Sequence, residues 1–280
     1  MKLITRILSR LHSIIKSPFR NHFTEITLTT NHHKILIPNN LAWAFPNGDY
    51  YEENVINFLD IIVKSYDKPV LIDVGANFGY YSVRYEHLCS HIFAFEPVST
   101  TYNVLKKNIE SNAVKNITLF KIGVSDTTGQ QEINLYNVSG NNSLFARTVP
   151  DDHPLKKIGK ETIKLNSLDI LIKNGRVTIP DIIKIDVEGA ELDVLKGAKN
   201  TIASHRPAII FEYSESTSVD AGYTKEALLN VLELIDYHVY GIPEKEDDLT
   251  LIKEEDFARH DIANVIFVPK EHDPFTNVIG

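Results

Sequence analysis

The sequence predicts a doubly wound α/β fold, with a mostly parallel sheet, an antiparallel strand at its C-terminal edge and an N-terminal extension. Two observations lead to this prediction. From residue 67 onward, short apolar runs alternate with helical patterns, which is typical of βαβ units. A glycine-rich loop, DVGANFG (73–79), ends the first apolar run, where open α/β sheets bind their ligands. We therefore divide the chain into an extension, 1–66, and a domain, 67–280.

Composition excludes some classes of function. The chain has 280 residues, with 29 basic and 37 acidic side chains and a net charge of −8. This acidic excess argues against nucleic acid as an electrostatic partner. The one cysteine, Cys89, excludes an intrachain disulfide and a multi-cysteine zinc site. A reducing compartment suits this composition, and we expect a cytoplasmic protein.

The first segment of the chain differs from the rest in charge. Residues 1–24 carry five of the basic side chains and no acidic one, which leaves the remainder at −13. Apolar residues between Leu3 and Ile15 recur at helical spacing and predict an amphipathic helix. Polar residues interrupt them too often for a membrane span. Packing on the protein is the favoured interpretation; the alternative is peripheral contact of residues 1–20 with the cytoplasmic face of an anionic membrane.

The other elements follow in chain order from their patterns. In the extension, runs at 24–30 and 34–37 flank a turn and predict a β-hairpin, followed by a helix at 50–64. In the domain, we expect helices at 79–88, 99–111, 190–199 and 224–235. The predicted parallel strands are 70–74, 91–96, 117–120, 182–186 and 208–212. An acidic loop, 243–261, joins two last strands, 237–241 and 264–268, which predicts an antiparallel pair at one edge.

The glycine-rich loop indicates the class of cofactor. Gly75 and Gly79 let a ligand approach the backbone, and Glu96 ends the next strand, where an acid accepts ribose hydroxyls. A dinucleotide prefers a middle glycine and no preceding acid, but this loop has Asn77 and Asp73. The Asp73 carboxylate would repel a phosphate and attract the ammonium of an amino acid. The loop therefore fits S-adenosylmethionine better than NAD.

Three acidic residues are candidates for catalysis. Asp186 follows a buried strand, Glu188 lies two residues further on, and Glu212 ends the neighbouring strand, so we expect them to converge near the transferred group. Crowded carboxylates raise one another's pKa and can then take a proton from a hydroxyl. The alternative is a divalent cation held by the same residues; capping of the next helix is the structural alternative. Glu191 is expected to face the dipole of that helix.

Six motifs resemble those of a known family. They are VLIDVGANFGYYS (70–82), FAFEP (93–97), GVSD (123–126), GNNSL (140–144), IIKIDVEGAELDVLKGA (182–198) and RPAIIFEY (206–213). Together they resemble the FkbM family of S-adenosylmethionine-dependent methyltransferases, which have a Rossmann-like sheet. The resemblance covers about residues 70–213 and leaves out the extension and the acidic C-terminal loop.

The resemblance implies a set of contacts to the cofactor. The methionine end would lie against Gly75, Asn77, Gly79, Tyr80 and Ser82, and Glu96 would hold the ribose. Val124, Ser125 and Asp126 would contact the adenine. Asn142 and Ser143 would belong to a loop that closes over the cofactor or the substrate. Residues 123–129 and 140–142 are also good turn sequences, which is the structural alternative for both segments.

The expected function is methyl transfer from S-adenosylmethionine to a hydroxyl. The resemblance implies a small-molecule or glycan acceptor, with a hydroxyl of a sugar, glycan or glycolipid precursor preferred and a polyketide-type or other small natural product as the alternative. Two other classes stay open: an NAD-dependent oxidoreductase and a non-catalytic nucleotide-binding α/β module. The sequence does not predict the oligomeric state.

Overall fold

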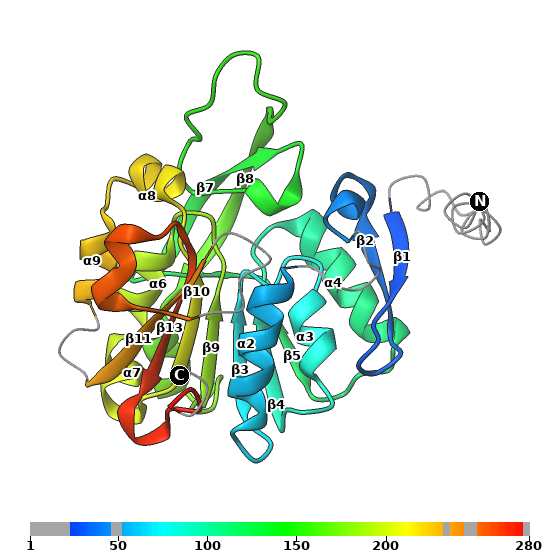
Figure 1. The fold of residues 1–280 in the computed structure, drawn as a ribbon. Coiled ribbons are helices and arrows are strands. Elements are labelled where there is room, and N and C mark those ends of the chain that lie inside the picture. The colour runs from blue at the N-terminus through cyan, green and yellow to red at the C-terminus, as the bar shows by residue number, and fades with distance from the viewer. Residues whose placement is uncertain (1–22, 46–51, 232–235, 244–250, 277–280) are drawn as a thin grey trace, which may run out of the picture.

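The computed structural model describes residues 23–45, 52–231, 236–243 and 251–276. They form one large sheet with helices on both faces, a smaller sheet above its upper end and a separate hairpin (Figure 1). The amphipathic helix predicted near the start of the chain lies outside these residues. Within the described ranges, no helix is long and apolar enough to cross a membrane.

The large sheet confirms the doubly wound, mostly parallel fold. Its strand order is β12-β11-β13-β10-β9-β3-β4-β5, and its last five strands run parallel. β13 lies antiparallel between β10 and β11, which confirms the predicted antiparallel pair, and the edge strand β12 was not visible in the sequence pattern. The strands are β3 (Val70–Val74), β4 (His91–Phe95), β5 (Ile117–Phe120), β9 (Ile182–Ile185), β10 (Ala208–Glu212), β11 (Tyr237–Pro243), β12 (Ile252–Lys253) and β13 (Ile262–Pro269).

Two apolar cores cover the two faces of this sheet. Successive strand side chains point to opposite faces, so Leu71 belongs to one core and Ile72 to the other. α2, α3 and α4 pack on the first core, and α5, α6, α7 and α9 on the second. The helices are α2 (Glu53–Lys64), α3 (Tyr80–Tyr85), α4 (Ser99–Ser111), α5 (Leu168–Lys173), α6 (Glu191–Gly197), α7 (Lys199–His205), α8 (Glu215–Ala221) and α9 (Lys225–Asn230).

A second, three-stranded sheet rises above the carboxyl ends of the parallel strands (Figure 1). It is formed by β6 (Gly123–Val124), β7 (Gly129–Tyr136) and β8 (Lys157–Asn166), in the order β6-β8-β7. The sequence analysis missed β7 and β8 because most of their side chains are exposed and polar, which hides the apolar runs that predict strands. The β7–β8 connection, residues 137–156, includes the short 3₁₀ turn η4 (Ser139–Asn141).

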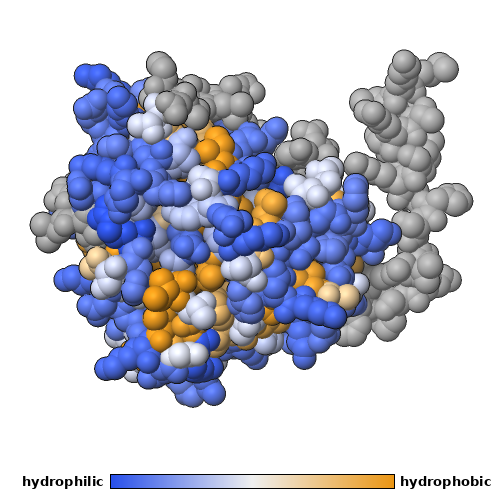
Figure 2. Space-filling model, turned by 90° about the horizontal axis from the view of Figure 1, so that it is seen from below, coloured by the Kyte–Doolittle hydropathy of each residue, from blue (hydrophilic) through white to orange (hydrophobic). Residues whose placement is uncertain are grey.

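The predicted hairpin is confirmed as β1 (Phe23–Thr27) and β2 (Lys34–Pro38). Two side-chain amides hold it to the domain, since Asn108 of α4 and Asn112, which follows α4, accept bonds from the backbone of β2. The 3₁₀ turn η3 (Asn39–Ala44) leads from β2 toward α2; two further 3₁₀ turns are η6 (Glu254–Arg259) and η7 (Lys270–His272). Seen from below, the molecule is largely hydrophilic with an apolar area to one side (Figure 2). The polar side chains considered next lie at the opposite, carboxyl ends of the strands.

Candidate active site

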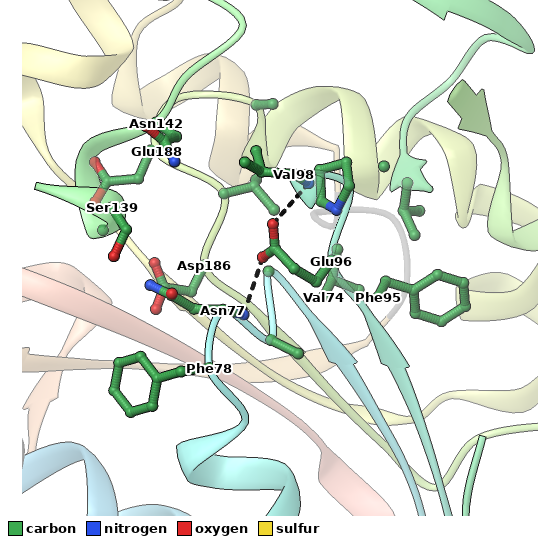
Figure 3. A pocket seen from close by; sticks show the side chains of 18 of the residues that line it. Val74, Asn77, Phe78, Phe95, Glu96, Val98, Ser139, Asn142, Asp186 and Glu188 are labelled. Atoms are coloured by element: carbon green, nitrogen blue, oxygen red, sulfur yellow. Dashed lines mark hydrogen bonds between the residues drawn. The ribbon is translucent and has the colours of Figure 1, made fainter. Parts of the chain in front are cut away.

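A pocket opens at the carboxyl ends of β3, β4, β9 and β10. In one view, Ser139, Asn142 and Glu188 lie on one side of it and Glu96 on the other (Figure 3). The predicted site residues that line this pocket are Gly75, Asn77, Tyr80, Glu96, Val124, Asn142, Asp186, Glu188 and Glu212.

The loop after β3 is left-handed at three positions. Gly75, Asn77 and Gly79 have φ angles of 81°, 50° and 89°, which glycine adopts freely and asparagine tolerates. A Cβ on Gly75 would lie 1.7 Å from the carbonyl oxygen of Asp186, so this position requires glycine. The Oδ1 atom of Asn77 is buried and has no hydrogen-bond partner among the described residues. The loop therefore presents an unsatisfied acceptor beside the pocket.

Glu96 is held in place by three hydrogen-bond donors. Its Oε1 accepts bonds from Val98 N and Thr101 Oγ1, both 2.8 Å long, and its Oε2 accepts one from Asn77 N at 3.0 Å. Figure 3 shows the bonds from Val98 and Asn77. Burial raises its pKa to about 7. Because Oε2 receives only this one bond in the described structure, it keeps capacity to accept another from a ligand.

Asp73 and Ser82 lie beneath the loop. The hydroxyl of Ser82 donates to Asp73 Oδ2 at 2.5 Å, and Asp73 is 1% exposed. Burial raises the pKa of Asp73, and the cation of Lys184 opposes the rise. The structure thus places these two residues under the pocket, while Gly79 packs against Leu105 of α4.

Lys184 is a buried cation that the sequence analysis did not single out. It lies inside β9, its Nζ is 3.0 Å from Asp186 Oδ2, and it lies 4.3 Å from the ring centre of Tyr81. Burial acts to lower the pKa of Lys184, but the carboxylates of Asp186 and Asp73 outweigh it and the pKa is raised. The sequence did offer a sign of this residue, a lysine within an otherwise apolar strand, because a buried charge needs a partner.

Asp186, Glu188 and Glu212 converge as expected. Each offers a carboxylate oxygen, and these oxygens lie within 4.8 Å of one another. Burial raises the pKa of Glu188 to about 8, against the opposing effect of Arg147. Burial, followed by the charges of Glu188 and Asp186, raises the pKa of Glu212 well above its ordinary value. Burial therefore favours the protonated forms of both Glu188 and Glu212.

Glu188 lies in a tight turn between β9 and α6. Its φ angle is 58° and that of Gly189 is 106°, which costs an ordinary residue about 1–3 kcal/mol. Glu191 accepts bonds from the backbone amide of Gly189, at 3.0 and 3.1 Å, and from that of Val187. The hydroxyl of Tyr223 donates to Glu191 at 2.7 Å. Glu191 does begin α6, as expected, but the sequence did not indicate that it closes this turn.

The β7–β8 connection contacts the same turn. Arg147 forms an ion pair with Glu188, and Ser143 Oγ donates to the carbonyl of Glu188 at 2.6 Å. Asn142 accepts a bond from the backbone of Tyr136 and faces the pocket, whereas Ser143 lies behind the pocket wall. Arg147 was not predicted, because the sequence alone does not show that this loop folds back onto Glu188.

The predicted adenine contacts separate in the structure. Val124 lines the pocket with the small sheet. Ser125 and Asp126 lie against Gly197 of α6, where an added Cβ would be 2.1 Å from the Ser125 carbonyl oxygen, and Asp126 is exposed. The structure does not bring Ser125 or Asp126 into the pocket wall.

The N-terminal extension completes the pocket. Leu41, Phe45 and Glu52 line it, and the hydroxyl of Tyr81 donates to Glu52 Oε2 at 2.7 Å. The ring of Phe45 packs edge-on against that of Tyr80, with centres 5.5 Å apart. The sequence had no motif to assign these residues.

A Rossmann-like sheet with a ligand pocket at its carboxyl ends defines the class of protein. The model of the FkbM methyltransferase domain matches residues 73–240, and the chain belongs to this family, which confirms the resemblance. Hexuronic acid methyltransferase AglP of Haloferax volcanii is 32% identical over 156 residues, which are 55% of this chain and 59% of AglP. 2-O-methyltransferase NoeI of Sinorhizobium fredii is 25% identical over 175 residues, 59% of this chain and 71% of NoeI.

Among solved structures, a methyltransferase FkbM from Methylobacillus flagellatus aligns with a TM-score of 0.46 and 20% identity, over 72% of this chain and 44% of that one. This chain therefore spans less than two thirds of the length of AglP, since the match covers 59% of that protein.

Proposed function

We propose that this protein transfers a methyl group from S-adenosylmethionine to the oxygen of a hydroxyl-bearing acceptor. The observation that carries the proposal is the cluster of Asp186, Glu188 and Glu212 at the mouth of the pocket, in which burial raises the pKa of Glu188 to about 8. A carboxylate with a pKa near neutrality is suited to take a proton from an alcohol. Methyl transfer to oxygen requires such a base.

The described residues fit the proposed cofactor. Val98, Val124 and Leu165 form an apolar wall on the side of the small sheet, which suits a purine ring. Glu96 has acceptor capacity for a ribose hydroxyl, and the unpartnered Oδ1 of Asn77 suits the ammonium of the methionine end. When bound, S-adenosylmethionine supplies an electrophilic methyl group on a positively charged sulfur.

In this proposal the chain's own residues orient the acceptor and move one proton. The acceptor hydroxyl loses its proton to Glu188 as its oxygen forms a bond to the methyl carbon, while the carbon–sulfur bond breaks and sulfur keeps the electron pair. Lys184 lies 3.0 Å from Asp186 and offsets the negative charge of that carboxylate. Holding the acceptor hydroxyl beside the methyl group supplies much of the rate acceleration expected of such a site.

A divalent cation is a second candidate occupant of the cluster. Three carboxylate oxygens within 4.8 Å of one another are the ligand type that hard cations prefer. Lys184 and Arg147 already neutralise two of these carboxylates, which leaves less negative charge for a divalent cation, so we favour a cluster without a bound cation. Activity that EDTA abolishes and Mg²⁺ restores would reverse this preference.

For the acceptor we propose a hydroxyl of a sugar, glycan or glycolipid precursor. The relatives include a hexuronic acid methyltransferase and a 2-O-methyltransferase, which supports a carbohydrate hydroxyl over a polyketide-type product. We further propose that the protein is cytoplasmic and that residues 1–20 contact the cytoplasmic face of a membrane. Loss of vesicle binding on deletion of residues 1–20 tests this contact.

Two measurements test the function. Titration calorimetry with S-adenosylhomocysteine should show binding that Asn77→Ala, which removes the Oδ1 acceptor, weakens; no binding would refute the cofactor, and binding of NAD instead would indicate an oxidoreductase. Transfer of labelled methyl from S-adenosylmethionine to glycan and lipid extracts should occur with the wild-type protein and fall sharply in Asp186→Asn. Cofactor binding without any transfer would indicate a non-catalytic module.

A further inference from the structure

The turn that carries Glu188 needs support from outside itself. Glu188 and Gly189 both have left-handed backbone, with φ angles of 58° and 106°, and a glutamate does not adopt this conformation readily. The direction of the Glu188 side chain depends on this backbone. The groups that hold the turn therefore decide where the carboxylate points.

Glu191 and Tyr223 hold the turn from behind. Both oxygens of Glu191 accept the Gly189 amide, and one also accepts the Val187 amide at 3.3 Å. The Tyr223 hydroxyl donates to Glu191 Oε2 at 2.7 Å. Glu191 is 2% exposed, and both side chains lie behind the residues that wall the pocket in the described part of the chain. They can act on a ligand only through the turn.

The other sides of the turn are also occupied. Ser143 donates to the carbonyl of Glu188, and Arg147 pairs with its carboxylate. An added Cβ on Gly189 would lie 3.0 Å from the carbonyl oxygen of Thr217 in α8, so the turn has little room to move sideways. Without Glu191, the backbone amides of Val187 and Gly189 lose their acceptor.

We propose that Glu191 and Tyr223 form a positioning pair that aims the Glu188 carboxylate at the acceptor hydroxyl. The proposal rests on the proposed function, because it assigns the pair a purpose in proton removal. It also links the connection between α8 and α9, where Tyr223 lies, to the catalytic geometry. Neither residue is assigned contact with substrate or cofactor.

The charges around Glu188 determine what loosening the turn should do. Arg147 lowers the pKa of this carboxyl, whereas burial, Asp186 and Glu191 raise it, and Glu212 couples to it from β10. A loosened turn lets water reach Glu188, so burial acts on it less and the pKa falls. The acid limb of the rate–pH profile should then move to lower pH.

The test compares Tyr223→Phe and Glu191→Gln with Tyr240→Phe. Tyr240 makes a similar bond, 2.6 Å to the carboxylate of Asp273. It lies in β11 and does not line the pocket, so it is the matched control. We expect Tyr223→Phe to lower kcat about 10-fold, the effect of losing a hydrogen bond to a charged group, with S-adenosylhomocysteine affinity unchanged. Glu191→Gln, which keeps one acceptor oxygen, should retain more activity than Glu191→Ala.

Hydrogen exchange of residues 186–190 is a second readout that does not need activity. It should speed up in Tyr223→Phe and Glu191→Gln and stay unchanged in Tyr240→Phe. If the wild type is active and Tyr223→Phe has the same kcat and the same pH profile, the positioning role is wrong. Unchanged hydrogen exchange in both variants would also overturn it. If the wild type binds S-adenosylhomocysteine but methylates no acceptor, the proposed function is refuted instead. The exchange data then test only whether Glu191 and Tyr223 hold the turn.

Discussion

Replacing Lys184 with methionine should destabilise the fold strongly and in a pH-dependent way. The ammonium is almost fully buried, at 4% exposure, and lies 3.0 Å from Asp186 with Asp73 as a second carboxylate neighbour. Methionine keeps the length of the side chain but leaves both carboxylates without their cation. Removing one partner of a buried ion pair costs about 3–5 kcal/mol, and we expect a loss of this size at neutral pH.

The sign of the pH dependence follows from Asp73. Burial already raises its pKa and Lys184 opposes that rise, so the pKa climbs further in the variant. A carboxyl whose pKa is higher in the folded than in the unfolded chain binds more protons when folded. The loss of folding stability caused by Asp73 therefore begins above about pH 4, the pKa of the unfolded chain. This loss is complete once the pH exceeds the pKa of Asp73 in the folded chain. The variant should lose less stability in acid than at neutral pH.

Urea denaturation followed by circular dichroism measures this at several pH values, with Lys64→Met as the matched control. Lys64 forms an exposed pair with Asp60 at 2.8 Å, with 60% of the lysine side chain accessible, and exposed pairs contribute about 0–1 kcal/mol. Equal losses in the two variants, or a loss in Lys184→Met that does not shrink in acid, would refute the reasoning.

Three further predictions follow from the pocket. Arg147→Met removes the cation that lowers the pKa of Glu188, now about 8, so the acid limb of the rate–pH profile should move up by about one pH unit; a downward or absent shift contradicts this. Gly75→Ala puts a Cβ 1.7 Å from the Asp186 carbonyl oxygen, so calorimetry should show a lower melting temperature, and a wild-type value would show that the strand ends can separate. Because the pKa of Glu96 is about 7, affinity for S-adenosylhomocysteine should fall as the pH drops through this value, since a protonated carboxyl accepts fewer hydrogen bonds. Glu96→Gln should bind about 10-fold more weakly and lose the dependence; calorimetry that finds the same slope in both proteins argues against Glu96 as the ribose acceptor.

The sequence by itself determined the sheet and the place of the site. Strands such as β3 and β9 are buried on both faces, so they read as short apolar runs. Glu96 and Asp186 directly follow β4 and β9, and Glu212 is the last residue of β10. Parallel strands bring their carboxyl ends to one edge. Local sequence was therefore enough to predict which acids converge.

The tertiary structure decided what surrounds those acids. Arg147 reaches Glu188 from a loop 41 residues away in the sequence, Tyr223 reaches Glu191 from 32 residues away, and Glu52 enters from the extension. Such contacts depend on how loops fold back, which leaves no periodic pattern in the sequence. The polar strands β7 and β8 were hidden for a related reason, since little of their surface is buried. Burial itself, which raises the pKa of Glu188 to about 8, is a property of the packed chain, because only packing removes water from a carboxylate.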